Sequence, residues 1–265
     1  MHNWYWQSWQ GLPYLTCSLL ESWPHGFFTQ HFWPQRPEEL VTVLSPNSQV
    51  YRIKQVHGNK VLSTTEIDLT KKTDNTELPS QELLSADGLV AETPNQAVWV
   101  CSADCAPVLI ANTETGKVAA VHAGWRGTAA KIVPIAIDRL LSQGSKLNSL
   151  VIAIGPGIAG EVYQVDVKVA AEVGSSIVAN SSNMETPSIL DTLFQLPNSP
   201  LLTDTEVDRV KLDVRRIIAL QLEKLGIHPE QIAIAPYCTY QNPDHFFSYR
   251  RDGLKKVQWS GIISK

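Results

Sequence analysis

Short runs of apolar residues, separated by polar turns, dominate the middle of the chain. These runs are rich in Val, Ile and Ala and are interrupted at Gly, Pro, Asp or Asn. Such a pattern predicts short strands bounded by turns. The segments predicted to hold strands are residues 51–57, 86–92, 97–112, 116–125, 149–158 and 231–239. Segment 97–112 holds two strands, divided by a polar break that contains Cys105.

Three other segments have apolar residues at helical spacing. Residues 127–144 predict a helix in which Thr128 is the N-cap, Gly144 is the stop, and Pro134 lies within the first two turns. Residues 166–177 predict a short helix. Residues 210–226 predict the clearest helix, with Gly226 at the C′ position; its apolar face comprises Leu212, Ile217, Ile218, Leu220 and Leu225.

The remaining segments show no clear period. The first fifty residues are rich in aromatic residues and proline, and residues 69–82 and 180–188 are polar enough to predict loops. Strands and helices are mixed without strict alternation. The pattern therefore predicts a single domain over residues 1–265, of the α/β or α+β class, built as a layered sandwich with a mixed sheet.

Composition narrows the function. The chain has 265 residues and a net charge of −4, so it has no general attraction to nucleic acid or to anionic membranes. No apolar run reaches the roughly 18 residues of a transmembrane helix. The aromatic N-terminus lacks the basic region of a signal peptide. We therefore expect a cytoplasmic protein without a nucleic-acid or membrane partner.

Cysteine usage agrees with this expectation. The four cysteines, Cys17, Cys101, Cys105 and Cys238, are irregularly spaced. In a cytoplasmic chain of this size they indicate free thiols, ligands or nucleophiles instead of a disulfide framework. Cys101 and Cys238 lie inside apolar runs and are interpreted as packed core residues; Cys17 is left unassigned.

Three residues interrupt or end apolar runs beside Gly, Pro or Asp, where a scaffold presents side chains to a site. They are His57 in "KQVHGN", Cys105 in "CSADCAP" and His122 in "AVHAGWRG". Two imidazoles and one thiolate form a common three-ligand set for zinc, with a fourth position open. Taken singly, a loop histidine is usually only solvated, and a lone cysteine is usually a small hydrophobic residue. If the three converge, the chain is a metalloenzyme.

Charged residues near this trio are candidates for supporting roles. Arg126, at the start of the helix that follows His122, is either a surface ion-pair partner or a clamp for an anion such as phosphate. Arg250 and Arg251 are a second candidate clamp. Asp87 and Asp104 are either turn caps or groups that orient a ligand.

The motifs "QVHGNKV", "ADGLV", "SADCAPVLI", "VAAVHAGWRGT", "AIGPGI…VYQV" and "FFSYRRDG" occur here in the order that is typical of the laccase-domain family. This family is also called the multicopper polyphenol oxidase, purine nucleoside phosphorylase or peptidoglycan editing factor family. The resemblance is strongest over residues 50–255. It implies a layered sandwich related to cysteine hydrolases, with a metal held by the residues that match His57, Cys105 and His122.

The resemblance also implies phosphorolysis of purine nucleosides, including adenosine, inosine, guanosine and methylthioadenosine, and deamination of adenosine. Two departures from the family pattern stand out. Gln30 replaces an arginine after "HGFFT", where a glycine-rich stretch is also missing, and Gly157 replaces a cysteine that many members have after "IGP". The first departure affects the contacts expected from the N-terminal region; neither changes the trio.

We therefore predict a zinc enzyme, a purine nucleoside phosphorylase with adenosine deaminase activity, in which His57, Cys105, His122 and Arg126 act in catalysis. Its substrates would be a nucleoside and phosphate, and the protein would be a monomer or homodimer. One alternative is a cysteine hydrolase that edits peptidoglycan precursors, with Cys105 as nucleophile; another is a binding protein without activity. The third is a copper-dependent polyphenol oxidase, since copper can occupy the same ligands. A full multicopper centre needs more histidines than the seven present.

Overall fold

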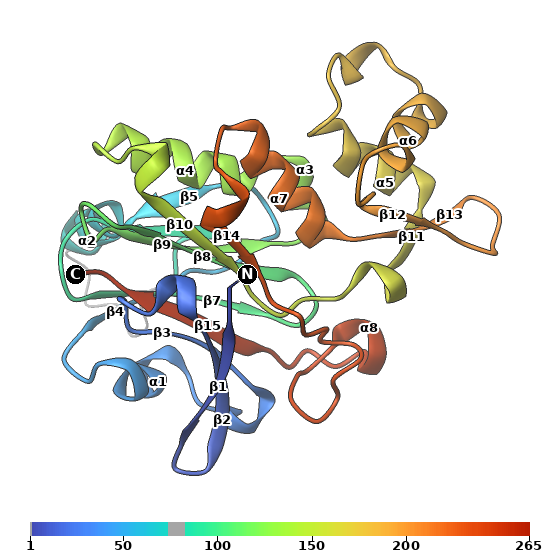
Figure 1. Ribbon diagram of the computed structural model, residues 1–265. Coiled ribbons are helices and arrows are strands. Elements are labelled where there is room, and N and C mark those ends of the chain that lie inside the picture. The colour runs from blue at the N-terminus through green and yellow to red at the C-terminus, as the bar shows by residue number, and fades with distance from the viewer. Residues whose placement is uncertain (1, 74–82) are drawn as a thin grey trace.

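The computed structural model describes residues 2–73 and 83–265, and these form three sheets with helices around them (Figure 1). The first six-stranded sheet has the order β1-β2-β3-β15-β7-β4. Its strands are β1 (Trp4–Trp9), β2 (Leu12–Cys17), β3 (His25–Phe28), β15 (Gln258–Ile263), β7 (Gln96–Ser102) and β4 (Gln49–Tyr51). Only the β4–β7 pair is parallel.

The second six-stranded sheet has the order β14-β10-β8-β9-β6-β5. Its strands are β14 (Ile232–Ile234), β10 (Leu150–Ile154), β8 (Ala106–Asn112), β9 (Val118–Ala123), β6 (Gly88–Ala91) and β5 (Val61–Ser63). The β10–β14 and β5–β6 pairs are parallel and the others are antiparallel. Both large sheets are therefore mixed.

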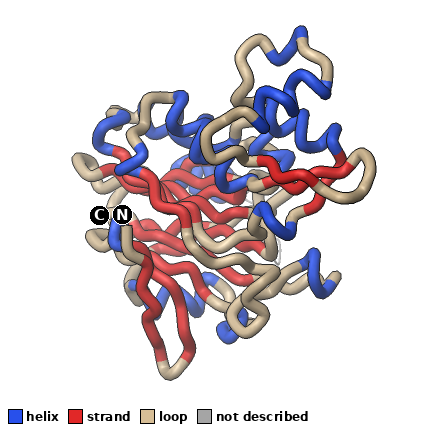
Figure 2. The backbone as a smooth tube through the Cα atoms, turned by 45° about the vertical axis from the view of Figure 1, so that its right-hand side comes forward, coloured by secondary structure: helices blue, strands red, loops and turns tan. Residues whose placement is uncertain are grey.

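The two large sheets pack face to face, and their strands fill the centre of the molecule (Figure 2). Successive side chains of β8 point to opposite faces of the second sheet, and both faces are buried, which explains why this strand is apolar throughout. Leu109 points into the core between the sheets, while Val108 and Ile110 point to the opposite face of the second sheet. A strand that is buried on both faces reads as a continuous apolar run.

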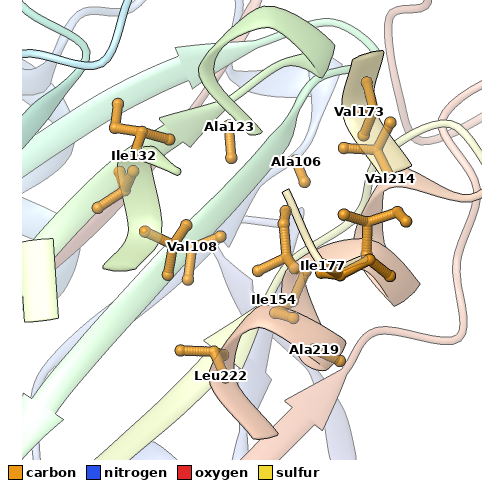
Figure 3. Packing of buried hydrophobic residues seen from close by; sticks show 14 of the residues in the cluster. Ala106, Val108, Ala123, Ile132, Ile154, Val173, Ile177, Val214, Ala219 and Leu222 are labelled. Carbon is orange, nitrogen blue, oxygen red and sulfur yellow. The ribbon is translucent and has the colours of Figure 1, made fainter. Parts of the chain in front are cut away.

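Helices cover the outer faces of both sheets. On the second sheet, Ile132 of α4 (Ile132–Ser142) and Leu222 of α7 (Val214–Lys224) pack with Val108 (Figure 3). On the first sheet, Leu40 of α1 (Pro37–Leu44) packs with Trp99. The predicted layered sandwich of mixed α/β class is thus observed, but with two stacked sheets in place of the single mixed sheet that was expected.

The third sheet is small and antiparallel, with the order β11-β13-β12. Its strands are β11 (Gln164–Asp166), β13 (Arg209–Leu212) and β12 (Leu201–Thr203). Together with α5 (Val167–Ser175) and α6 (Thr186–Phe194) it projects from one end of the sandwich (Figures 1 and 2). Among the described helices, none is both long and apolar enough to cross a bilayer.

The helix predicted over residues 127–144 is two helices, α3 (Trp125–Ala129) and α4. The chain breaks at Lys131, whose φ is 58°. Pro134 explains the break, because a proline ring in a continuous helix would clash with the carbonyl of Ala130, four residues earlier. Gly124, not Thr128, is the N-cap of α3.

The helix predicted over residues 210–226 begins late. Residues up to Leu212 form β13, and α7 starts after Asp213, whose carboxylate accepts hydrogen bonds from the backbone N–H groups of Arg215 and Arg216. This side-chain cap fixes the start of the helix. Gly226 has a φ of 92°, as the predicted C′ position requires.

Several boundaries were also wrong. Of residues 51–57 only Tyr51 belongs to a strand, and the polar segment 180–188 includes the start of α6. The segment 69–82 begins inside α2 (Thr64–Thr73), and its residues 74–82 lie outside the described part of the chain. Residues 2–50, which show no period, contain β1, β2, β3, α1 and the start of β4. Pairing with distant β15 and β7 supplies order that local sequence does not encode.

Candidate functional site

His57, Cys105 and His122 converge. One ligand atom from each residue lies within 4.8 Å of the other two, and the His57 and His122 ring centroids are 4.8 Å apart. His57 belongs to the turn between β4 and β5, Cys105 to the break between β7 and β8, and His122 to β9. Antiparallel pairing of Ala106 with Ala123 brings the start of β8 beside the end of β9. His122 is buried, Cys105 is half-buried and His57 is exposed.

Asp87 organises two of the three residues. Its side chain is fully buried at the start of β6. Its Oδ1 atom accepts hydrogen bonds from Nδ1 of His122 at 2.9 Å and from the backbone N–H of His57 at 2.9 Å. Its Oδ2 atom accepts from the N–H groups of Gly58 at 2.7 Å and Val56 at 3.2 Å. His57 has a φ of 60°, which lets successive N–H groups of the turn point at one carboxylate.

These contacts set the tautomer of His122. Because Nδ1 donates to Asp87, the proton stays on that atom and Nε2 is left as the ligand atom. Burial alone would raise the pKa of Asp87, but its hydrogen bond with His122 and those with the Gly58 and Val56 amides lower it. The contacts of Asp87 thus agree with both sequence interpretations, because the carboxylate caps the turn of His57 and also orients His122, a candidate ligand.

The thiol of Cys105 is acidic in this setting. Burial alone would raise its pKa, but hydrogen bonds and charge from His122 and His57 outweigh burial and lower the pKa to about 6. For His122, burial lowers the pKa, but Asp87 and Cys105 together raise it to about 9. The contact between the two groups therefore favours the thiolate of Cys105 and the protonated form of His122 together.

Glycines allow the close approach of backbone to these ligands. A Cβ atom on Gly124 would lie 2.8 Å from Sγ of Cys105, and one on Gly127 would lie 2.8 Å from the carbonyl oxygen of Gly58. Both distances are shorter than van der Waals contact. The start of α3 thus packs directly onto the thiol and onto the turn that carries His57.

The donor set fits a zinc ion. Two imidazole nitrogens and a thiolate with a lowered pKa are the ligands that zinc prefers, and a buried carboxylate fixes one imidazole from behind. With bond lengths of roughly 2.0–2.3 Å, ligand atoms around one zinc lie a few ångströms apart, which agrees with the 4.8 Å limit.

Asp104 has a different role from Asp87. Its carboxylate accepts hydrogen bonds from Oγ1 of Thr239 and from the backbone N–H of Arg250, both at 2.7 Å, while its own carbonyl accepts from Ile158. Its φ of 95° is uncommon for a residue with a Cβ atom. Asp104 therefore ties the segments around residues 158, 239 and 250 to the position next to Cys105.

The three candidate arginines are placed differently. Arg126 is exposed, and its guanidinium lies 4.2 Å from the ring centroid of Trp125. Arg250 is also exposed, with its guanidinium 4.8 Å from the ring centroid of Tyr163. The guanidinium of Arg251 instead donates to the carbonyls of three residues and to Asp252, so it holds the chain together; the three are Thr239, Tyr240 and Phe246.

A small cavity of about 40 Å³ opens beside the thiol. Its lining includes Cys105, Gly124 and Trp125, and also Tyr163 and Arg215, which the sequence did not single out. Tyr163 directly precedes the third sheet and lies in the motif "VYQV", to which the resemblance gave no role, whereas Arg215 lies in α7, where no motif marks it. A larger depression of about 610 Å³, with Trp23 and Lys265 in its lining, contains none of the three ligands.

The two family departures have structural counterparts. Gln30 donates from its side chain to the carbonyl of Pro243 and from its backbone to that of His245. A Cβ atom on Gly157 would lie 3.1 Å from the carbonyl oxygen of Asp104, so a side chain there needs a small shift of the Cys105 segment.

Among the other cysteines, Cys17 and Cys238 are buried, and Cys101 is half-buried.

The chain is similar to proteins of known sequence along most of its length. It is 52% identical over 261 residues to purine nucleoside phosphorylase slr1573 of Synechocystis sp., covering 98% of this chain and 97% of that protein. It is 34% identical over 207 residues to purine nucleoside phosphorylase Rv2149c of Mycobacterium tuberculosis, covering 78% and 69%.

Solved structures share the fold. YlmD from Geobacillus stearothermophilus superposes with a TM-score of 0.79 at 22% identity and covers 98% of both chains. The hypothetical protein YfiH of Bacillus licheniformis gives a TM-score of 0.73 at 23% identity, covering 95% and 96%. The family model described as multi-copper polyphenol oxidoreductase laccase matches residues 35–263. The chain therefore belongs to this laccase-domain family.

Proposed function

We propose that this protein is a zinc-dependent purine nucleoside phosphorylase. Its substrates are adenosine, inosine, guanosine and methylthioadenosine, and it also deaminates adenosine. The observation that carries the proposal is the meeting of His57, Cys105 and His122 within 4.8 Å, behind which Asp87 is buried. The names of relatives that are 52% and 34% identical support the reaction class.

Phosphorolysis exchanges one bond at the anomeric carbon. The bond between C1′ and N9 breaks, its electron pair leaves with the purine, and the purine takes up a proton. A phosphate oxygen forms the new bond to C1′, which yields the sugar 1-phosphate. The site therefore needs to hold a phosphate, to place a proton donor near the purine and to stabilise positive charge on the sugar ring.

The chain's own residues meet part of this need. Asp87 keeps His122 in one tautomer and keeps the turn of His57 against the thiol. Trp125 and Tyr163 present half-buried aromatic surfaces beside Cys105, suited to contact with a purine or a sugar. A zinc ion held by the trio would supply Lewis acidity and lower the pKa of a coordinated water to about 7. Arg126 is the proposed fourth functional residue.

A cysteine hydrolase is the second candidate. The sequence of contacts from the acidic thiol of Cys105 through His122 to Asp87 is the arrangement of a nucleophile, a base and an orienting carboxylate. Such an enzyme would act on amide bonds, for example in a peptidoglycan precursor, and would need no metal in turnover. By contrast, a multicopper centre finds no support, since within residues 2–73 and 83–265 this is the single group of three or more His, Cys or carboxylate ligands.

One experiment separates these functions. The purified protein is incubated with adenosine and phosphate, products are identified by mass spectrometry, and metal content is measured before and after chelation. We expect one zinc per chain, adenine and ribose 1-phosphate as products, and loss of activity on chelation that zinc restores. Phosphorolysis that persists without metal would overturn the zinc requirement, and absence of any nucleoside product would overturn the proposal and leave the cysteine hydrolase as the candidate.

The variant His122→Ala tests the ligand assignment. It is expected to lose stoichiometric zinc, because Nε2 of His122 would be one of three protein ligands. His228→Ala is the matched control, since His228 lies outside the cluster, and it should keep both metal and activity. If the His122→Ala protein still holds one zinc and turns over adenosine, the assignment is wrong.

A further inference from the structure

Two exposed guanidinium groups flank the cavity beside Cys105. Trp125 and Tyr163 both line that cavity. Arg126 lies over the ring of Trp125 at 4.2 Å, and Arg250 lies over the ring of Tyr163 at 4.8 Å. Each arginine thus rests on an aromatic residue that forms part of the cavity wall. Stacking on a ring restricts a guanidinium to one orientation while its N–H groups stay available.

Most N–H donors of these two guanidinium groups form no hydrogen bond with the described residues. Among the described residues neither forms an ion pair with a carboxylate, and the one side-chain hydrogen bond of Arg250 is from Nη1 to the carbonyl of Gln164 at 2.9 Å. This differs from Arg251, whose donors are engaged by carbonyls and by Asp252. The guanidinium groups of Arg126 and Arg250 therefore have N–H donors that no carboxylate of the described residues occupies.

The position of Arg250 is coupled to that of the thiol. Its backbone N–H donates to Oδ2 of Asp104, the residue that precedes Cys105 in the chain. The other carboxylate oxygen of Asp104 accepts from Thr239, so both oxygens of this cavity-lining acid are engaged by donors. Asp104 thus holds Arg250 at a set place relative to Cys105, and its own charge is partly compensated.

Tyr163 lies within electrostatic reach of both arginines. Burial raises the pKa of Tyr163 to about 12, the charges of Cys105 and Asp104 add to the rise, and those of Arg250 and Arg126 oppose it. The cavity of about 40 Å³ has room for roughly three water molecules, which matches one tetrahedral oxyanion and not a nucleoside. Arg215, which is paired with Asp213, lies in the lining itself, whereas Arg126 and Arg250 lie behind the aromatic residues that line the cavity.

We propose that Arg126 and Arg250 form a two-arginine site for inorganic phosphate at the cavity beside Cys105. The inference rests on the proposed phosphorolysis and assigns its second substrate to named side chains. Paired guanidinium forks suit the oxygens of phosphate, and phosphate bound here lies next to the metal ligands. In this arrangement the nucleoside lies against the exposed surfaces of Trp125 and Tyr163, outside the small cavity.

The test measures phosphate binding separately from turnover. Variants Arg126→Ala and Arg250→Ala, the conservative variant Arg250→Lys and the control Arg36→Ala are prepared with zinc. Arg36 is exposed at the start of α1 and does not line the cavity beside Cys105. Binding of inorganic phosphate is measured by isothermal titration calorimetry, and KM for phosphate is measured with inosine. Zinc content and thermal unfolding confirm that each variant is folded.

The expected loss is about 10-fold or more in phosphate affinity for each alanine variant, since each removes charge-assisted hydrogen bonds. KM for phosphate should rise by a similar factor while KM for inosine changes little, and Arg250→Lys should recover part of the loss. Arg36→Ala should match the wild type. If AMP binds better than inorganic phosphate and is lost in the same variants, the site is for a nucleotide phosphate, and the assignment to free phosphate is overturned.

Failure of this inference and failure of the proposed function give different results. If the wild type phosphorolyses inosine but both alanine variants keep phosphate affinity and KM within about 2-fold, the phosphate assignment is wrong and the function stands. If the wild type binds phosphate through these arginines but yields no ribose 1-phosphate, the proposed function fails and the anion site stands. Absence of phosphate binding to the wild type overturns the site.

Discussion

Oδ1 of Asp87 lies 2.9 Å from Nδ1 of His122, and the same oxygen accepts the backbone N–H of His57 at 2.9 Å. One fully buried oxygen atom therefore positions two of the three candidate metal ligands. The third, Cys105, approaches from a separate strand break, where Gly124 leaves room for its sulfur.

Replacing Asp87 by Asn should weaken zinc binding about 10- to 100-fold, the effect usual for a group that orients a metal-ligating histidine. The amide keeps the shape of the side chain but loses the charge that holds the proton on Nδ1 of His122. Competition with a chromophoric chelator measures the change. Asp191→Asn, at an exposed position on α6, is the control. Unchanged zinc affinity in the Asp87→Asn protein would refute this role.

Adding one methyl group at Gly124 should disrupt the site. The new Cβ would lie 2.8 Å from Sγ of Cys105, so the thiol or the start of α3 has to move. We expect Gly124→Ala to lose zinc affinity by about 10-fold or more, since ligand geometry decides affinity. Gly58→Ala is the matched control, because its nearest contacts of 3.6 and 3.7 Å are ordinary. Equal zinc content and affinity in both variants would count against the predicted crowding.

The ion pair between Glu66 of α2 and Arg139 of α4 should make stability depend on pH. Burial alone would raise the pKa of Glu66, but its hydrogen bonds to Arg139, at 2.7 and 3.2 Å, and to Ser63 lower it. A carboxylate with a lowered pKa stabilises the fold above its unfolded-state pKa, near 4.5, and the contribution disappears as the pH falls through the folded-state value.

Comparison of the wild type with Glu66→Gln by urea unfolding from pH 7 to pH 3 checks this sign. The difference in the free energy of unfolding should be largest at pH 7 and shrink below about pH 4.5. Glu172→Gln, at an exposed position on α5, is the control for the effect that removing any carboxylate has on the pH dependence of stability. A difference that grows as the pH falls would show that the sign is wrong.

The break between α3 and α4 offers a stabilising substitution. Lys131 is exposed and has a φ of 58°, a conformation that costs a residue with a Cβ atom more than it costs glycine. Lys131→Gly should raise the free energy of unfolding by about 0.5–1 kcal/mol. Lys146→Gly, where φ is −119°, should lower it or leave it unchanged. Urea unfolding at pH 7 measures both, and a loss of stability in Lys131→Gly would contradict the argument.

The sequence by itself determined the residue types of the site and the family. Cys105 and His122 stand next to the ends of apolar strands, where a strand presents side chains beyond the sheet, whereas His57 lies in a turn between two short strands. Apolar runs in β8, β9 and β10 likewise marked buried strands, because side chains buried on both faces have to be apolar. The mixed α/β class followed from these runs and from the helical period of α7.

Tertiary structure alone decided how these parts meet. Asp87 and Asp104 look alike in sequence, yet one carboxylate faces His122 and the other faces Thr239 and Arg250, because their neighbours come from distant segments. The same reason separates exposed Arg250 from engaged Arg251, and brings Tyr163 to the cavity wall. Two stacked sheets replaced one because an apolar run does not reveal which layer will cover it. The pattern of apolar residues along the chain indicates which segments are buried. Which side chains meet in the folded protein depends on contacts between segments that are far apart in the sequence.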